Sequence, residues 1–264
     1  MADMNETVRR SRFWLPLWQR YGEAPSIALC RVPELEYAAR LTRKGRLLDH
    51  CCGDGTFASL AWPGRSAVVG CDIDAQALGA AARRGLYLCV VRSDVSRGLP
   101  FESGSFDIVF NNSGLEHVRA LDSVLEEVAR VLRPGGEFAL NVLNHRYFEW
   151  WPVGDAARDA YRQWQPFFHA LPLSGWSQRL KSAGFEIARV EGYFDRRAAR
   201  MLAELDCAFS GFFLAGQRGA LVSWYQRMPR VMGALWRRRL ESLRWRTEPD
   251  AGAGFFIEAR RLGP

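Results

Sequence analysis

The fold of this chain is decided by one stretch, Arg46-Leu-Leu-Asp-His-Cys-Cys-Gly-Asp-Gly-Thr-Phe57. Two apolar residues run into an acid, then into a turn with two glycines, and then into a helix-like run over 56–61. This order predicts a strand, a tight turn and a helix. Gly53 and Gly55 lack a Cβ, so they can adopt positive φ and let a ligand approach bare backbone. The amides that open the following helix favour an anionic group on that ligand.

Further apolar runs follow, at the spacing of strands that alternate with helices. Strands are expected over 67–74, 90–95, 106–112 and 137–142, and a helix over 120–132 before the stop at Arg133-Pro-Gly-Gly136. Several of these runs end in a polar residue, such as Asp72 and Asp94. Asp72 follows Asp49 at about the distance at which nucleotide-binding folds place the acid that accepts hydrogen bonds from ribose hydroxyls. Open parallel sheets bind their ligands at these carboxyl ends.

Six short motifs occur in one order along the chain. They are Leu47-Leu-Asp-His-Cys-Cys-Gly-Asp-Gly55, Gly70-Cys-Asp-Ile-Asp74, Asp94 with Leu99-Pro-Phe101, Ser105-Phe-Asp-Ile-Val109, Leu115-Glu-His-Val118 and Leu132-Arg-Pro-Gly-Gly136. Together they resemble the class I S-adenosylmethionine-dependent methyltransferases, in particular their small-molecule, type 11-like branch. The resemblance covers residues 40–145, and a weaker similarity extends over residues 173–190. It implies an α/β fold with a Rossmann-like, seven-stranded, mostly parallel sheet and helices on both faces.

The resemblance also implies S-adenosyl-L-methionine as the cofactor and S-adenosyl-L-homocysteine as its product. The implied cofactor-binding residues are Asp49, Cys51, Gly53, Gly55, Asp72, Ile73, Asp94, Val95 and Asn111. In this scheme Asp49 and the glycine turn hold the methionine portion, and Asn111 lies near that end. Asp72 binds the ribose hydroxyls. Ile73 flanks the adenine, and Asp94 with the following amide reads the adenine edge.

Two residues of the glycine turn depart from the family pattern. The family usually has glycine where this chain has Cys51, and a small or apolar residue where it has His50. We expect Cys51 to fit with a negative φ, in a slightly more open turn.

Composition sets the outer bounds. The 264 residues are 48% hydrophobic, enough for one domain with appendages. No run of about 18 uncharged apolar residues occurs, which excludes a membrane span. The N-terminus lacks the apolar core of a signal peptide, so a cytoplasmic location is expected. The six cysteines have no metal-ligand spacing, which predicts buried, reduced thiols and no metal site.

We expect three parts along the chain. Residues 1–41 form a helical N-terminal lid, 42–194 with 251–264 form the methyltransferase core, and 195–250 form a helical insertion or cap. The aromatic segment 9–29 could instead be a packing helix at the sheet edge, and a helix over 33–41 leads into the first strand. A helix over 173–184 is expected to begin with Ser174 as its N-cap and to end at Gly184. The insertion separates the sixth strand (185–191) from the seventh (254–261).

The net charge of +7 is concentrated in the insertion. Residues 218–246 contain eight Arg and one Glu, which gives +7 and leaves the remainder neutral. Within 218–246, aromatic residues lie on one side of a predicted helical stretch and arginines lie off that side. This pattern is typical of a helix in a membrane interface. Of three possible roles for the insertion, a cap over the substrate pocket is ranked first, contact with a membrane surface second and a homodimer interface third.

The predicted reaction is methyl transfer to an O or N atom of a small, apolar or aromatic, or lipid-linked acceptor. Aromatic residues near the expected opening favour such an acceptor; they are Trp14, Trp18, Phe148, Trp150, Trp151, Trp164, Phe167 and Phe168. His145 is the candidate catalytic residue, because histidine has the right pKa to remove a proton from a hydroxyl or an amine. Tyr147 and His169 are the other titratable groups near the opening.

Three other functions remain open. The arginine-rich insertion could recruit RNA or a protein as the methyl acceptor. Nucleic acid is disfavoured, because Asn111-Asn-Ser-Gly stands where many amino-directed nucleic-acid enzymes carry Asn-Pro-Pro-Tyr. The chain could also be a non-catalytic, cofactor-binding scaffold. A nicotinamide dehydrogenase is disfavoured because the three-glycine fingerprint is absent.

Overall fold

The computed structural model describes residues 6–21, 24–41, 44–151, 154–164, 166–209 and 229–263. The chain divides into two compact units, each built from three separate segments. The first unit comprises 1–36, 145–167 and 192–254, and the second comprises 37–144, 168–191 and 255–264.

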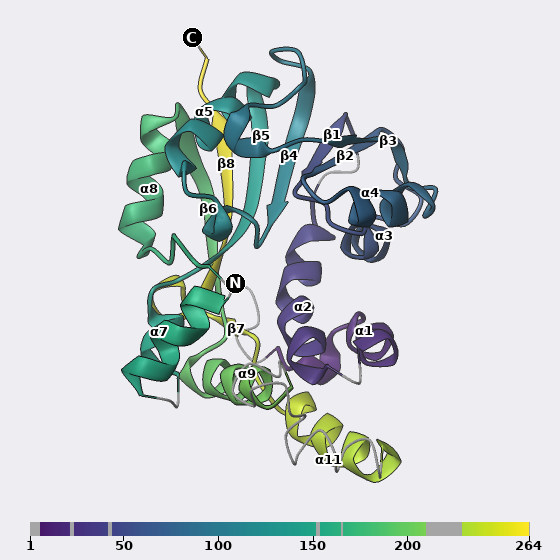
Figure 1. Ribbon diagram of the computed structural model, residues 1–264, viewed down its shortest axis with the longest axis vertical. Helices are drawn as coiled ribbons and strands as arrows, with labels where there is room; N and C mark the ends of the chain where they lie inside the picture. Colours follow the sequence, from purple (N-terminus) through teal and green to yellow (C-terminus); the bar gives the residue numbers. More distant parts are fainter. Residues whose placement is uncertain are drawn as a thin grey trace. The chain divides into compact units, whose positions relative to one another are not determined.

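One sheet runs in the order β3-β2-β1-β4-β5-β8-β6-β7 (Figure 1). Its strands are β1 (Leu47–His50), β2 (Val68–Asp72), β3 (Tyr87–Arg92), β4 (Phe106–Asn112), β5 (Leu132–Leu143), β6 (Phe185–Tyr193), β7 (Arg246–Thr247) and β8 (Gly254–Arg261). The pairs that join the first five strands are parallel, and β6 pairs with β7 antiparallel. The predicted Rossmann-like α/β fold is confirmed. The sheet has eight strands rather than seven, because β7 is a two-residue strand too short to leave a pattern in the sequence.

Helices cover both faces of the sheet in the second unit. They are α3 (Thr56–Ala61), α4 (Ala75–Ala82), α5 (Leu121–Val131) and α8 (Leu173–Ser182), with short 3-10 turns η2 (Val95–Arg97) and η3 (Leu115–His117). The buried residues of α5 recur at helical spacing and join Trp176 of α8 and Phe138 of β5 in one apolar core. On the opposite face Phe110 stacks on Phe57 at 5.5 Å and meets Trp62 edge-on at 5.0 Å.

Some boundaries differ from those expected. β3 begins at Tyr87, before the apolar run at 90, because Tyr87 pairs with Val68. β5 begins at Leu132 and so includes the glycines expected to lie before it, with a register shift in its pairing with β4. Pro172, not Ser174, is the N-cap of α8, and no side chain caps that helix end. Gly184, with φ of 84°, follows α8 as predicted.

The first unit is mostly helical. It contains η1 (Val8–Arg10), α1 (Trp14–Tyr21), most of α2 (Pro25–Ala38), α6 (Arg146–Glu149), α7 (Asp155–Trp164), α9 (Arg196–Phe209), α11 (Pro229–Glu241) and η5 (Pro249–Ala251). α2 begins at Pro25 rather than at Pro33, since proline is favoured in the first helical turn. The parts of the expected insertion at 210–228 lie outside the described residues. The lid and cap roles of the two helical segments stay predictions.

The cysteines behave only partly as expected. Cys30, Cys51, Cys52, Cys71 and Cys89 are free thiols, and Cys89 is exposed on β3 rather than buried. β3 has one neighbour only, so an apolar run there does not imply burial on both faces. The thiol of Cys207 lies outside the described residues. The part of the chain that the structure describes contains no cluster of three potential metal ligands. In that same part, no helix has the length and apolar character that crossing a bilayer requires.

Candidate cofactor site

The turn after β1 uses two glycines for different reasons. Gly53 has φ of 54° and Gly55 has φ of 72°, so both adopt the left-handed backbone expected of them. A Cβ on Gly53 would meet no atom within 4 Å, so the backbone there is open to a ligand. A Cβ on Gly55 would lie 2.8 Å from Cε2 of Tyr87, so that glycine lets the turn pack against β3.

Cys51 contradicts the expectation of a negative φ. Its φ is 63°, which places an L-residue with a Cβ in the left-handed region. This conformation costs roughly 1–2 kcal/mol for residues other than glycine. Its side chain lies beside η3, because a Cβ added to Gly114 would come within 3.0 Å of Cys51 Cβ. The turn therefore keeps a conformation suited to glycine, and the cysteine bears the strain.

Asp72 connects the end of β2 to the glycine turn. Its Oδ2 accepts the Gly53 N–H at 2.8 Å, and its Oδ1 accepts the Asp74 N–H at 3.0 Å. An ionised carboxylate has about four acceptor positions, so about two remain for hydroxyl donors. Ile73 follows with 59% of its surface exposed. An acceptor and an open apolar side chain thus stand next to each other, and their predicted contacts with ribose and adenine stay predictions.

Asp49 lies at the third position of β1 and is only 4% exposed. Its Oδ2 accepts the Tyr87 hydroxyl at 2.7 Å. Burial raises the pKa of Asp49 from 3.8 to about 7; the Tyr87 hydrogen bond opposes this shift and the charge of Asp72 adds to it. A cationic ligand group beside this carboxyl would favour its ionised form.

His50 and Asn111 form a buried pair at the ends of β1 and β4. They are register partners, and both side chains are fully buried. Asn111 Nδ2 lies 2.8 Å from His50 Nδ1 and donates to the His50 carbonyl at 3.0 Å. Asn111 Oδ1 accepts the backbone N–H groups of Gly114 and Leu115 at 3.2 and 3.3 Å. Asn111 therefore holds two strand ends and η3 together, a role that the sequence did not indicate.

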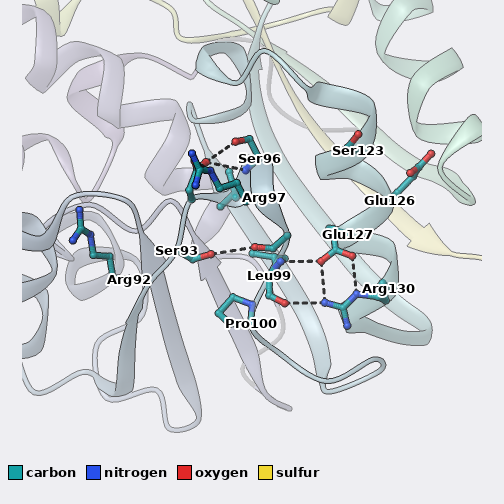
Figure 2. Close-up of a pocket in the computed structure, with 13 residues that line it drawn as sticks. Arg92, Ser93, Ser96, Arg97, Leu99, Pro100, Ser123, Glu126, Glu127 and Arg130 are labelled. Atoms are coloured by element: carbon teal, nitrogen blue, oxygen red, sulfur yellow. Dashed lines mark hydrogen bonds and ion pairs between the residues drawn. The ribbon is translucent and has the colours of Figure 1, made fainter.

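Asp94 and Val95 line an open groove of ≈ 960 Å³. Figure 2 shows this groove with Ser96, Leu99 and Arg130 among its labelled lining residues. Asp94 Oδ1 accepts both the hydroxyl and the N–H of Ser96, at 2.6 and 3.1 Å, and these bonds lower the pKa of Asp94. Arg130 on α5 donates to the carbonyls of Leu99 and Phe101 at 2.9 and 2.8 Å. These bonds fix the loop that forms the groove onto α5, so the expected adenine-reading segment has a defined shape.

All nine predicted cofactor residues belong to the second unit, whereas His145 begins a segment of the first. Hydrogen bonds connect Asp49 to β3, Asp72 to Gly53, and Asn111 to β1. His145 is half-exposed, and its Nε2 lies 3.6 Å from Glu149 Oε1. Its catalytic role stays a prediction. Sequence reasoning gave no role to Tyr87 or His50, although His50 carried a signal as a polar residue at a position usually apolar.

Residues 48–140 match the family model described as a methyltransferase domain. A probable S-adenosylmethionine-dependent methyltransferase of Mycolicibacterium smegmatis is 30% identical over 173 residues, which cover 65% of this chain and 62% of that protein. The demethylmenaquinone methyltransferase of Beutenbergia cavernae is 41% identical over 96 residues, which cover 36% and 39%. This chain spans less than two thirds of the length of these curated relatives.

The fold is also similar to that of solved structures. The crystal structure of an S-adenosylmethionine-dependent methyltransferase from Mesorhizobium loti aligns with a TM-score of 0.55 at 20% identity. The alignment covers 88% of this chain and 98% of that one. At this level of identity the likeness concerns the fold.

Proposed function

We propose that the protein is an S-adenosylmethionine-dependent methyltransferase, since residues 48–140 match the model of a methyltransferase domain. The observation that carries the proposal is the Gly53–Asp72 pair. One carboxylate both fixes the open glycine turn and keeps acceptor positions for a ribose.

The residues at the strand ends fit the proposed cofactor. Gly53 leaves bare backbone for the methionine portion, and Asp49 offers a carboxyl to its ammonium group. Ile73 presents an exposed apolar side chain for the adenine. The groove at Asp94 and Val95 offers an acceptor and an amide for the adenine edge.

The cofactor, when bound, supplies an activated methyl group on a sulfonium. The chain then has to bind it, orient it and keep water away. Alignment of the acceptor atom with the methyl carbon accounts for much of the rate in such transfers. Tight anchoring of the cofactor at its ribose by Asp72 serves this alignment directly.

The first test is calorimetric titration with S-adenosylhomocysteine, with NAD as the control ligand. We expect micromolar binding of S-adenosylhomocysteine and none of NAD. In Asp72→Ala the two ribose hydrogen bonds to a charged acceptor are lost, which weakens binding by roughly 100-fold or more. Wild-type affinity in that variant would show that Asp72 does not hold the ribose.

We further propose an apolar, aromatic or lipid-linked acceptor. Three of the aromatic residues first offered as support, Trp14, Phe148 and Trp151, are buried in the core and cannot face an acceptor. Support comes instead from a relative named demethylmenaquinone methyltransferase. Transfer of a labelled methyl group from S-adenosylmethionine to a lipid extract, compared with a water-soluble metabolite pool, tests the class. Labelling of the water-soluble pool alone contradicts it.

His145 is proposed as the general base for this transfer. If so, His145→Gln lowers kcat and leaves S-adenosylhomocysteine affinity unchanged. An unchanged kcat would mean that alignment alone suffices.

The exposed face of α11 supports contact with an anionic lipid surface. Val231 and Leu235 lie one turn apart and are 56% and 60% exposed. Arg238 continues the same helical face, and Arg239 adjoins it; both are exposed. Exposed apolar residues beside arginines match a helix that lies in a lipid interface, and each arginine near an anionic surface contributes about 1 kcal/mol.

Co-sedimentation with phosphatidylcholine vesicles, with and without phosphatidylserine, tests this contact. Binding is expected only with phosphatidylserine, and a Val231→Ser, Leu235→Ser double variant should lose it. Leu88→Ser is the matched control, because Leu88 is 68% exposed on β3. Equal binding of the double variant and the control would rule out α11 as the contact.

A further inference from the structure

Asp54 lies between the two glycines of the turn after β1 and connects that turn to the start of α3. Its Oδ1 accepts the N–H of Thr56 at 2.9 Å, and its Oδ2 accepts the hydroxyl of the same residue at 2.7 Å. Burial opposes ionisation of this carboxyl, but the hydrogen bonds from Thr56 and the charge of Arg84 lower the pKa of Asp54. Asp54 is therefore a carboxylate at neutral pH.

Arg84 reaches this turn from just beyond the end of α4, 30 positions along the chain. Its Nε donates to the Asp54 carbonyl at 2.6 Å, and its Nη2 donates to Asp54 Oδ2 at 3.0 Å and to the Thr56 hydroxyl. The arginine stem packs against the turn, because a Cβ added to Gly55 would lie 3.2 Å from Arg84 Cδ. A planar guanidinium that engages two oxygens of one residue fixes their orientation as well as their distance.

The glycine turn is thus held at two neighbouring residues. Asp72 accepts the N–H of Gly53 at 2.8 Å, and Arg84 donates to the carbonyl of the next residue. Glycine has more backbone freedom than any other residue, so a turn with two glycines keeps one conformation only where contacts restrain it. Gly53 is also the residue whose backbone is open to a ligand. The contact from Arg84 therefore restrains the backbone that the cofactor is proposed to approach.

Arg84 belongs to the surroundings of the site rather than to its open face. It lines a surface pocket of ≈ 300 Å³ together with Ser59 and Gly85, whereas Asp94 and Val95 line the groove described above. An influence of Arg84 on the cofactor therefore passes through the turn.

We propose that Arg84 is a positioning residue for the cofactor, because it holds the glycine turn in the conformation that receives the methionine portion of S-adenosylmethionine. The inference rests on the proposed function and deepens it. A turn that is ordered in advance loses little conformational freedom when a ligand binds, which strengthens binding. Loss of the Arg84 contacts should therefore weaken only those ligands that touch the turn.

The test compares two ligands that differ in the amino acid group. S-adenosylhomocysteine carries this group, and 5′-methylthioadenosine has the same adenosine and thioether without it. Arg84→Met keeps a stem that packs against Gly55 and removes the donors. We expect this variant to bind S-adenosylhomocysteine about 3- to 10-fold more weakly, because ordering of the turn then accompanies binding. Its affinity for 5′-methylthioadenosine should not change. Arg83→Met removes a neighbouring exposed arginine and should change neither affinity.

The outcomes separate this inference from the proposed function. Any result other than a selective loss of S-adenosylhomocysteine binding, such as equal losses for the two ligands or none for either, would overturn the role of Arg84 while the methyltransferase proposal stands. A wild-type protein that binds neither ligand would overturn both. If Arg84→Met does not fold, Arg84→Lys replaces it, since lysine keeps the charge and the stem but has no planar pair of donors. A selective loss is expected there too, and wild-type affinity for both ligands would overturn the inference.

Discussion

Replacing Asp49 by asparagine should stabilise the protein at high pH. The asparagine side chain is nearly isosteric and still offers an oxygen to the Tyr87 hydroxyl, which lies 2.7 Å from the present carboxyl. The change removes the charge that burial disfavours. The pKa of Asp49 is about 7 in the folded protein and 3.8 in the free side chain. The folded state therefore holds this proton more tightly than the unfolded state.

The sign and size follow from proton linkage. A carboxyl with a raised folded pKa contributes stability that is complete below pH 3.8 and is lost as the pH rises to about 7. Each pKa unit corresponds to about 1.4 kcal/mol, so the full loss is on the order of 4 kcal/mol. Of the roughly three pKa units that separate 3.8 from about 7, about two lie between pH 5 and pH 8. The free energy of unfolding of the wild type should therefore fall by about 3 kcal/mol relative to the variant over that range.

Urea unfolding at pH 5 and pH 8 measures this difference directly. The difference between wild type and variant at each pH is compared, because it isolates the effect of the Asp49 carboxyl. Glu102→Gln, which replaces an exposed carboxyl by an amide, is the matched control for the change of residue type. A difference between Asp49→Asn and wild type that is the same at both pH values would refute the reasoning.

Three further variants test the turn and the groove. Gly55→Ala should cost about 2 kcal/mol or more in urea unfolding, because left-handed strain adds to a 2.8 Å contact with Tyr87; Gly85→Ala, with φ of 68° and no atom within 4 Å, should cost only the strain. Cys51→Gly should raise the free energy of unfolding by about 0.5–1 kcal/mol, which is the left-handed strain that glycine relieves minus the entropic cost of ordering a glycine. A gain of the same size in Cys51→Ala would contradict this. Arg130→Met should destabilise the protein by about 1–2 kcal/mol, since it loosens the loop at Asp94. It should weaken the binding of S-adenosylhomocysteine and of 5′-methylthioadenosine, which has the same adenosine and thioether without the amino acid group, by equal factors. A selective loss of S-adenosylhomocysteine binding would contradict this.

The core of the fold was predictable because its strands and turns carry strong local signals. Thr56–Ala61 and Phe106–Asn112 have the predicted bounds, since a glycine turn precedes the helix and polar or glycine residues flank the strand. β7 was not predictable, because a two-residue strand is defined by its partner β6 and has no pattern of its own. The same holds for the start of α2: Pro25 and Pro33 both suit a first helical turn, and only packing distinguishes them.

The candidate site also has features that could be predicted from the sequence and features that could not. The positive φ of Gly53 and Gly55 was predictable from residue type, because it depends on backbone geometry alone, whereas the ribose-binding role of Asp72 stays a prediction. The sign of φ at Cys51 was not predictable, since the turn imposes it against the preference of the side chain. The Asp49–Tyr87 and His50–Asn111 pairs join residues 38 and 61 positions apart. No local pattern encodes such contacts, which arise from the order of the strands.

The position of β8 has a consequence for the order in which the chain folds. β8 lies between β5 and β6, yet residues 194–253 are synthesised after β6 and before it. During synthesis β6 therefore emerges before β8, its neighbour towards the centre of the sheet. The backbone N–H and C=O groups on that edge of β6 have no strand partner until β8 is made. The parallel strands from β1 to β5 can assemble first, and β8 then completes the sheet. Pulse-labelling hydrogen exchange during refolding should accordingly show protection of β1 and β4 before that of β6.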